Sequence, residues 1–235
     1  MAETFAYTDI GQHRPTNEDA ACVLPQGAAI VADGMGGYAA GEVASSLLIE
    51  TARRVLTETA QPWDEDVLRR AVIEANRAIL SEAARTPSCE GMGTTATMVS
   101  YAGEQHAVWA HVGDSRLYLL RDGVLQQITR DHSLVEDLVE SGTITKEEAR
   151  NHPKKNVLTR AVGVDAALTV DTGHFALQAG DVLLLTTDGL TNMVAEETIT
   201  RLLAEHPDDP AQALGTSANT AGGRDNITAV VVRIP

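Results

Sequence analysis

Short apolar runs separated by polar turns fill much of the chain, and their lengths predict strands. Runs of about four to eight residues rich in valine, isoleucine and leucine, ended by glycine or aspartate, are typical of buried strands. The sequence therefore predicts strands at 5–9, 20–24, 28–32, 95–102, 106–112, 117–120, 124–128, 168–170, 181–186 and 227–234. Asp122-Gly123, which lies between two of these runs, predicts a tight hairpin.

Four longer segments repeat apolar residues at helical spacing. In 41–56, Val43 and Leu47 fall on one face, and a second helix begins after Asp64, whose side chain suits an N-cap. Two more helices are predicted at 196–205 and 211–220. Because the strands follow one another through hairpins and the helices come in pairs, the order indicates an α+β fold rather than a doubly wound parallel sheet.

Residues 131–163 differ from the rest of the chain. They are polar, carry one short helical pattern from Leu134 to Val139, and hold a predicted capped turn at 145–148. All three lysines of the chain lie within this segment. We interpret it as a flap laid over the edge of the sheet. It belongs to a single expected domain spanning 1–235, because no linker or internal repeat interrupts the chain.

The net charge of −15 narrows the partners that the protein is expected to bind. A protein that binds nucleic acids or anionic membrane surfaces needs a positively charged surface, so neither kind of partner is expected. Cys22 and Cys89 make no disulfide framework, which fits a reducing compartment. The first residues lack the basic and apolar regions of a signal peptide, and no apolar run is long enough to span a bilayer. We therefore expect a cytoplasmic protein without a membrane anchor.

Carboxylates recur at the ends of the predicted strands. They are Glu18 with Asp19, Asp33, Asp114, Asp188 and Asp225. Asp33 and Asp188 each follow a buried apolar run and precede a glycine. Any one such Asp-Gly pair is well explained as a turn, as at Asp122. Several together favour a metal centre, because a carboxylate at a buried strand end needs a cation beside it.

Oxygen-only ligands favour Mg²⁺ or Mn²⁺ over zinc, and the seven histidines form no zinc motif. Two such ions about 3.5–4 Å apart can share a carboxylate and activate a water molecule. They can also stabilise the attacking and leaving oxygens when a phosphoryl group is displaced in line. Asp33 is the natural shared ligand, with the carbonyl of Gly34 beside it. Arg14 suits phosphate oxygens because its charge is permanent and its fork matches them, although a surface salt bridge explains this arginine equally well.

Six short motifs in order resemble the protein phosphatase 2C family of metal-dependent serine/threonine phosphatases, in its compact bacterial form. Each motif alone is weak, but six at domain-wide spacing are specific. The motifs are Arg14-x-x-Asn17-Glu18-Asp19, Val31-Ala32-Asp33-Gly34-Met35-Gly36-Gly37, Gly93-Thr94-Thr95, Val112-Gly113-Asp114-Ser115-Arg116, Thr187-Asp188-Gly189 and Gly223-Arg224-Asp225-Asn226. The resemblance extends from about Phe5 to Ile234, which is essentially the whole chain.

The resemblance implies a four-layer α-β-β-α sandwich, in which paired helices flank two central antiparallel sheets. It also implies hydrolysis of phosphoserine and phosphothreonine in proteins. A hydroxide bridging two Mn²⁺ or Mg²⁺ ions would attack phosphorus in line, without a phosphoenzyme. Phosphorylated proteins and an opposing serine/threonine kinase are then the expected partners, and we expect a monomer.

The resemblance assigns roles to single residues. Asp33, Asp188 and Asp225 would hold the first ion, and Asp33 with the Gly34 carbonyl would hold the second. Arg14 would bind the phosphate group during catalysis. The segment 131–163 would be the variable flap beside the active site, and its residues there include Asn156, Thr159 and Arg160.

Five further positions carry weaker expectations from the same resemblance. Glu18 would help to hold the ions through water, with Asp19 behind it, and Asp114 would bind a weaker third ion. Asn192 stands where many family members have an acid, which would weaken that third site. Met35 replaces a histidine that serves many eukaryotic members as the proton donor, so a metal-bound water is the preferred acid here.

Other functions have some support in the sequence. Gly34-x-Gly36-x-x-Ala39, between a strand and a helix, matches the dinucleotide-binding fingerprint. Against it, Asp33 would repel a pyrophosphate, and a second helix follows where that fold requires a strand.

A serine hydrolase with the usual Gly-x-Ser-x-Gly motif would need a final glycine where Leu117 stands. A phosphoprotein-binding pseudoenzyme is disfavoured because the metal-ligand positions are intact. The basic residues between Lys146 and Arg160 would steer acidic phosphoproteins or, as we favour, form a solvated face.

Overall fold

Two antiparallel sheets pack face to face in the computed structural model, which describes residues 2–37, 40–102, 105–205 and 208–235. The first sheet is β1 (Glu3–Asp9), β11 (Ile227–Arg233), β10 (Val182–Thr186), β7 (Arg116–Arg121) and β8 (Val124–Gln127), in spatial order. The second is β2 (Asp19–Leu24), β3 (Ala28–Met35), β5 (Ala96–Ser100), β6 (His106–Val112) and β9 (Asp171–Ala176), with β4 (Gly93–Thr94) paired to β3.

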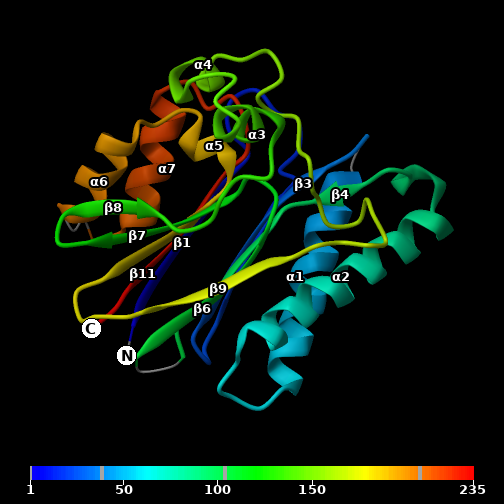
Figure 1. Cartoon of the computed structure of the whole chain (residues 1–235), viewed down its shortest axis with the longest axis horizontal. Helices are drawn as coiled ribbons and strands as arrows, with labels where there is room; N and C mark the ends of the chain where they lie inside the picture. Colours follow the sequence, from blue (N-terminus) through cyan, green and yellow to red (C-terminus); the bar gives the residue numbers. More distant parts are fainter. Residues whose placement is uncertain (1, 38–39, 103–104, 206–207) are drawn as a thin grey trace.

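Helices cover the outer face of each sheet, which gives four layers (Figure 1). α1 (Ala40–Glu58) and α2 (Glu65–Arg85) lie on the second sheet, whereas α6 (Glu196–Ala204) and α7 (Pro210–Thr220) lie on the first. The short helices are η1 (Pro87–Cys89), α3 (Leu134–Glu140), α4 (Lys146–Arg150) and α5 (Asp188–Thr191). Across the described part of the chain, no helix is both long and apolar enough to span a bilayer. The expected four-layer α+β sandwich is confirmed.

Three apolar cores separate the four layers. Along β3, Ala28, Ile30 and Ala32 pack toward α1 and α2, whereas Ala29 and Val31 face the other sheet. Both faces of the central strands are therefore covered. This explains why those strands read as continuous apolar runs in the sequence rather than as an alternation of apolar and polar residues.

The predicted strand at 168–170 is wrong. The strand in this region is β9, which starts at Asp171 and pairs with β6 at the edge of the second sheet. Leu168 and Val170 pack on the core beside α1 and α2 without joining the sheet. Leu168 and Val170 are therefore apolar because they anchor a loop on the core. The edge strand β9 is half-exposed, so its sequence shows little of the apolar pattern that predicts a strand.

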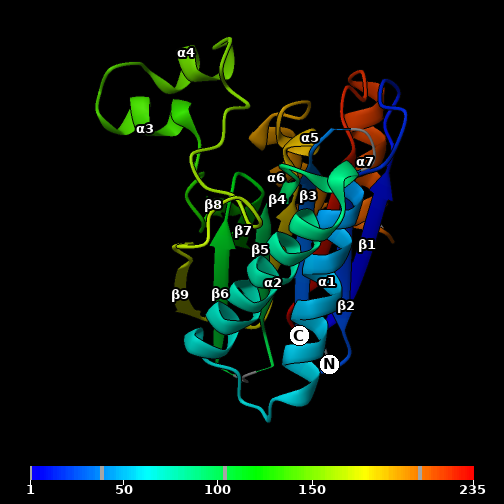
Figure 2. The same ribbon diagram turned by 90° about the vertical axis from the view of Figure 1, so that its right-hand side faces the viewer.

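The flap, residues 131–163, leaves the first sheet after β8 and returns before β9. Its helices α3 and α4 lie beyond the ends of the strands rather than over a sheet edge (Figure 2). The predicted cap is present, since Thr145 and Glu148 form a capping box that begins α4. The predicted hairpin between β7 and β8 also forms, with Asp122 and Gly123 both at positive φ.

The antiparallel pairing of β3 excludes the dinucleotide-binding fold. Both neighbours of β3 in the sheet, β2 and β5, run antiparallel to it, and α1 leads into α2 rather than into a strand. A fingerprint of that kind requires a parallel βαβ unit. Ala39, the last residue of the matching pattern, lies outside the described residues.

Candidate metal centre

The predicted acidic residues meet at one end of the sandwich because of strand direction. β3 and β6 both run antiparallel to β5, so Asp33 and Asp114 leave the second sheet at the same end. In the first sheet, the end of β10 lies beside the start of β11, which brings Asp188 near Asp225. One cavity of about 370 Å³ opens between them. It is lined by all seven predicted site residues: Arg14, Glu18, Asp33, Gly34, Asp114, Asp188 and Asp225.

Asp33 stands at the end of β3 with its main chain fixed on both sides. Its backbone N–H donates to the hydroxyl of Thr95, and its carbonyl accepts from the hydroxyl of Thr94, both at 2.9 Å. Asp19 is its partner across the ladder with β2. Burial, followed by repulsion from Asp19 and Asp188, holds the pKa of Asp33 well above its usual range.

Asp19 carries a buried oxygen that lacks a hydrogen-bond partner. Its Oδ2 accepts from the Thr187 hydroxyl at 2.8 Å, whereas its Oδ1 is buried and unsatisfied. Burial raises the pKa of Asp19 to about 7, with Asp188 and Asp225 contributing repulsion. Because an unpaired buried carboxylate oxygen is unfavourable, a donor or a cation is expected beside this atom.

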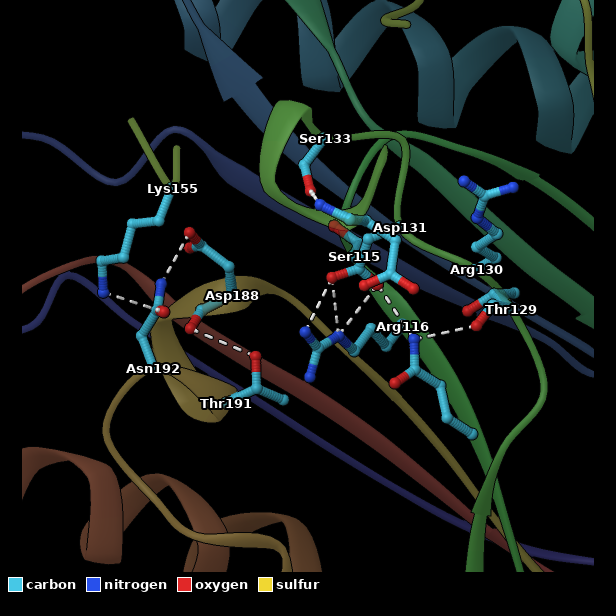
Figure 3. A network of polar contacts seen from close by, with 12 residues as sticks. Ser115, Arg116, Thr129, Arg130, Asp131, Ser133, Lys155, Asp188, Thr191 and Asn192 are labelled. Carbon is cyan, nitrogen blue, oxygen red and sulfur yellow. Dashed lines mark hydrogen bonds and ion pairs between the residues drawn. The ribbon is translucent and has the colours of Figure 1, made fainter. Parts of the chain in front are cut away.

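Asp188 begins the short helix α5, directly after β10. Asn192, one turn later, donates from Nδ2 to Oδ2 of Asp188 at 2.8 Å (Figure 3). Burial, with repulsion from Asp225, raises the pKa of Asp188 to about 6. The sequence did not predict α5, because a four-residue helix is too short to show an apolar period.

Asp114 follows β6 after Gly113, which adopts a left-handed φ of 109°. Burial, with repulsion from Asp188, raises the pKa of Asp114 to about 8. Arg116, two residues later, donates to both oxygens of Asp131 at 2.7 to 3.0 Å (Figure 3). This ion pair ties the start of β7 to the first residue of the flap.

Arg14 donates from Nη2 to Oδ2 of Asp225 at 2.7 Å. Asn226 fixes the loop that carries this arginine, since its Nδ2 donates to two carbonyls of loop 10–16, at 3.0 and 2.9 Å. Its Oδ1 accepts from the backbone N–H of Glu18 at 2.8 Å. No role for Asn226 was predicted from the sequence. The available signal was an amide side chain directly before a strand in the Gly-Arg-Asp-Asn motif.

Gly34 is a glycine because other backbone segments approach it closely. A Cβ there would lie 2.1 Å from the carbonyl oxygen of Gly41 and 2.6 Å from that of Glu18. The Gly34 N–H donates to that Glu18 carbonyl at 3.1 Å, so the first turn of α1 and the Glu18 loop meet at the end of β3. Burial raises the pKa of the Glu18 carboxyl, against the opposing effects of Arg14 and the Gly41 N–H.

The donor set fits a hard divalent cation. Carboxylates and a backbone carbonyl are the oxygen ligands that Mg²⁺ and Mn²⁺ prefer, and a cation would relieve the repulsion that raises the pKa values here. Within the described ranges, no three His, Cys, Asp or Glu side chains already converge as a metal site. Asp225 and Asp188 are hydrogen-bonded to Arg14 and Asn192 instead. Binding of an ion would therefore exchange these hydrogen bonds for metal bonds.

The flap forms one wall of the cavity. Its lining residues are Asn156, Leu158, Thr159, Arg160 and Ala161. Arg160 donates from Nη1 to Oδ1 of Asp171 at 2.6 Å. His132 accepts the Gly113 N–H at Nδ1, so its Nε2 carries the proton and donates to Oδ2 of Asp171 at 3.2 Å. Asp171 was not predicted as a site residue, because the strand that it begins, β9, was predicted three residues too early.

Two positions bear on the alternatives for catalysis. Met35 lines the cavity, and the lining within the described residues contains no histidine, so no imidazole stands ready as a proton donor. Ser115 is fully buried, and its hydroxyl is hydrogen-bonded to that of Thr95 at 2.7 Å. This serine packs inside the sandwich, which excludes it as an exposed hydrolase nucleophile.

Comparison with known proteins shows the family to which this chain belongs. The sequence profile described as Protein phosphatase 2C matches residues 12–218. The chain is 43% identical to "Serine/threonine phosphatase stp" of Listeria monocytogenes, over 96% of this chain and 93% of that protein. The crystal structure of the serine/threonine phosphatase PstP/Ppp of Mycobacterium tuberculosis matches with a TM-score of 0.93 and 39% identity, over 99% of this chain and 98% of that one.

A further solved structure bears on the ions. It is the catalytic domain of the serine/threonine protein phosphatase PstP in complex with two manganese ions. It matches with a TM-score of 0.91 and 38% identity, over 100% of this chain and 99% of that one. The chain described here therefore belongs to the protein phosphatase 2C family and is a serine/threonine protein phosphatase.

Proposed function

We propose that the cavity holds the catalytic metal ions of this phosphatase, as Mn²⁺ or Mg²⁺. Asp33, Asp188 and Asp225 hold the first ion, and Asp33 with the carbonyl of Gly34 holds the second. One observation carries the proposal: carboxylates from both sheets, separated by much of the sequence, line the same cavity as an arginine. When bound, such a pair of ions supplies an activated water and neutralises the charge of the phosphoryl group.

Glu18, Asp19 and Asp114 have supporting roles in this proposal. Glu18 approaches the ions through water, and Asp19 stands behind it with its unsatisfied Oδ1. Asp114 binds a weaker third ion together with Asp188, which is the neighbouring carboxylate with the largest effect on its pKa. The replacement of a family acid by Asn192 is expected to keep this third site weak.

Arg14 binds the phosphate of the substrate. Its guanidinium keeps its charge at all relevant pH values and can contact two phosphate oxygens at once. To do so it must turn away from Asp225, which is then available to the first ion. The proton for the leaving serine or threonine oxygen comes from water, because Met35 cannot supply one.

The substrates are proteins that carry phosphoserine or phosphothreonine, and a serine/threonine kinase with the opposite activity is a proposed partner. We further propose that the chain acts as a monomer in the cytoplasm. Residues 1–235 would form one catalytic domain, with 131–163 as its flap. The strongly acidic composition is consistent with protein substrates rather than nucleic acid.

Hydrolysis of a phosphothreonine peptide tests the metal assignment. The wild type, Asp188→Ala and Asp66→Ala are compared in EDTA, Mg²⁺ or Mn²⁺. Asp66 is an exposed carboxylate on α2 and serves as the matched control. Turnover that requires the metal, survives Asp66→Ala and is lost in Asp188→Ala supports the proposal. Equal turnover with and without EDTA would overturn it.

A further inference from the structure

The arm of the flap, residues 134–157, contributes no described residue to the three apolar cores of the sandwich. Its helices α3 and α4 contain no buried residue. The backbone hydrogen bond from Leu134 N–H to the Val157 carbonyl, at 2.8 Å, closes the base of the arm, and Arg130, just before the flap, pairs with Asp137 and Glu140 of α3. Polar contacts therefore contribute to where the arm rests.

One such contact reaches the metal centre. Lys155 donates from Nζ to Oδ1 of Asn192 at 3.1 Å (Figure 3). Among the described residues, this is the one hydrogen bond between the arm and a part of the protein outside 129–163. Lys146 and Lys154 carry the same charge on the same arm but make no such side-chain contact within the described structure.

Asn192 passes this contact on to Asp188. An ammonium group can only donate, so the Oδ1 of Asn192 must face Lys155 and its Nδ2 must face the Asp188 carboxylate, to which it donates at 2.8 Å. Lys155 is thereby joined to the Asp188 carboxylate through a single amide side chain. The arm thus places a positive charge beside a carboxylate of the cavity.

We propose that Lys155 is a positioning residue of the metal centre: through Asn192 it holds the flap arm against Asp188, and it is released when a divalent cation binds there. This inference rests on the proposed role of Asp188 as a metal ligand. The ammonium group of Lys155 is separated from the Asp188 carboxylate by one amide side chain, so it and a divalent cation bound to that carboxylate repel each other. Coupling of this kind is reciprocal, so the docked arm weakens cation binding by the same factor by which the cation weakens docking.

Hydrogen exchange of the arm tests the contact itself. In the metal-free protein, Lys155→Ala and Asn192→Ala should both increase amide exchange within 134–157, because each removes one side of the contact. Lys154→Ala, which removes the same charge from the neighbouring position, should exchange like the wild type, and Lys155→Arg should restore protection. Wild-type exchange in Lys155→Ala, or equal effects of the Lys154 and Lys155 substitutions, would overturn the proposal.

Titration with Mn²⁺ tests the coupling. Adding Mn²⁺ to the wild type should increase exchange in the arm, whereas Lys155→Ala should show no further increase. Calorimetry should find Mn²⁺ bound about five-fold more tightly by Lys155→Ala than by Lys154→Ala. A merely structural lysine would give weaker or unchanged binding, and that result would contradict the proposal. If the wild type bound no Mn²⁺, the metal role of Asp188 would be wrong, and the metal-free exchange would still decide whether Lys155 holds the arm.

Discussion

Arg14 and Asp225 are hydrogen-bonded to each other, with 2.7 Å between Nη2 and Oδ2. The pair joins the proposed phosphate-binding group to a proposed metal ligand. Their side chains are 47% and 28% exposed, so solvent screens the contact, and separating the two groups costs about 1 kcal/mol or less. Substrate and ion can therefore replace this contact without a large penalty.

Arg14→Ala should lower kcat/KM for a phosphothreonine peptide about 10²-fold, because a charged donor aimed at the phosphoryl oxygens is lost. Arg14→Lys should recover only part of the activity, since an ammonium cannot form the same two-pronged contact. Mn²⁺ affinity, measured by calorimetry, should not fall in Arg14→Ala, because the substitution removes a cation that competes for Asp225. Weaker Mn²⁺ binding with normal kcat/KM at saturating metal would indicate that Arg14 only positions Asp225.

Asp33→Asn and Asp114→Asn remove one carboxylate each from the same cavity, but their effects should differ. Asp33 is the proposed shared ligand, so its loss should prevent binding of both core ions and lower kcat about 10³-fold. Asp114→Asn should remove only the weaker third ion and leave two. The number of bound Mn²⁺ ions and the rate of peptide hydrolysis check both outcomes. Equal loss of ions in the two variants would refute the separate roles.

The metal-free protein should become less stable as the pH rises. The pKa values of Asp188, Asp19 and Asp114 are raised to about 6, 7 and 8, mainly by burial, from an ordinary value of 3.8. Between the ordinary and the raised values, the folded chain binds more protons than the unfolded chain, so the free energy of unfolding falls with increasing pH.

Thermal unfolding in EDTA should accordingly give a lower Tm at about pH 8 than at about pH 5.5. Saturating Mn²⁺ should reduce or reverse this slope, because bound ions neutralise the same carboxylates. The control is the same pair of pH values with Asp114→Asn, in which one of the buried titrating carboxyls is absent and the slope should be smaller. A metal-free Tm that increased over this range would contradict the expectation.

Gly34→Ala should destabilise the fold by about 3 kcal/mol or more, because the added methyl group would overlap two backbone carbonyl oxygens that cannot easily move. Gly37→Ala is the matched control, since a Cβ there meets nothing within 4 Å. Urea unfolding of both variants measures the difference. Similar midpoints for the two substitutions would mean that α1 shifts to make room.

Local patterns in the sequence predicted most elements correctly. The apolar runs of β3 and β10 and the capping box at Thr145 are strong signals carried by a few neighbouring residues. The elements that escaped prediction lack such signals. β9 lies half-exposed at a sheet edge, and α5 is a single helical turn that depends on the strand before it.

The convergence of the site could not be predicted from local patterns alone. Which strand ends meet depends on the order and direction of strands in two sheets, and the resemblance to a known family supplied that information. Asn226, and the contact between Lys155 and Asn192, were missed for a related reason. Amide and lysine side chains are common on surfaces, and only the tertiary structure shows which of them reach across the cavity.

The meeting of strand ends from both sheets also has a consequence for biosynthesis. Asp33 is made early in translation, whereas Asp225 comes immediately before β11, the last strand described. A nascent chain on the ribosome therefore lacks part of the proposed metal centre until β11 has emerged and paired with β1 and β10. If Asp225 is a metal ligand as proposed, phosphatase activity cannot precede completion of the sandwich, and an unfinished chain is unable to dephosphorylate proteins around it.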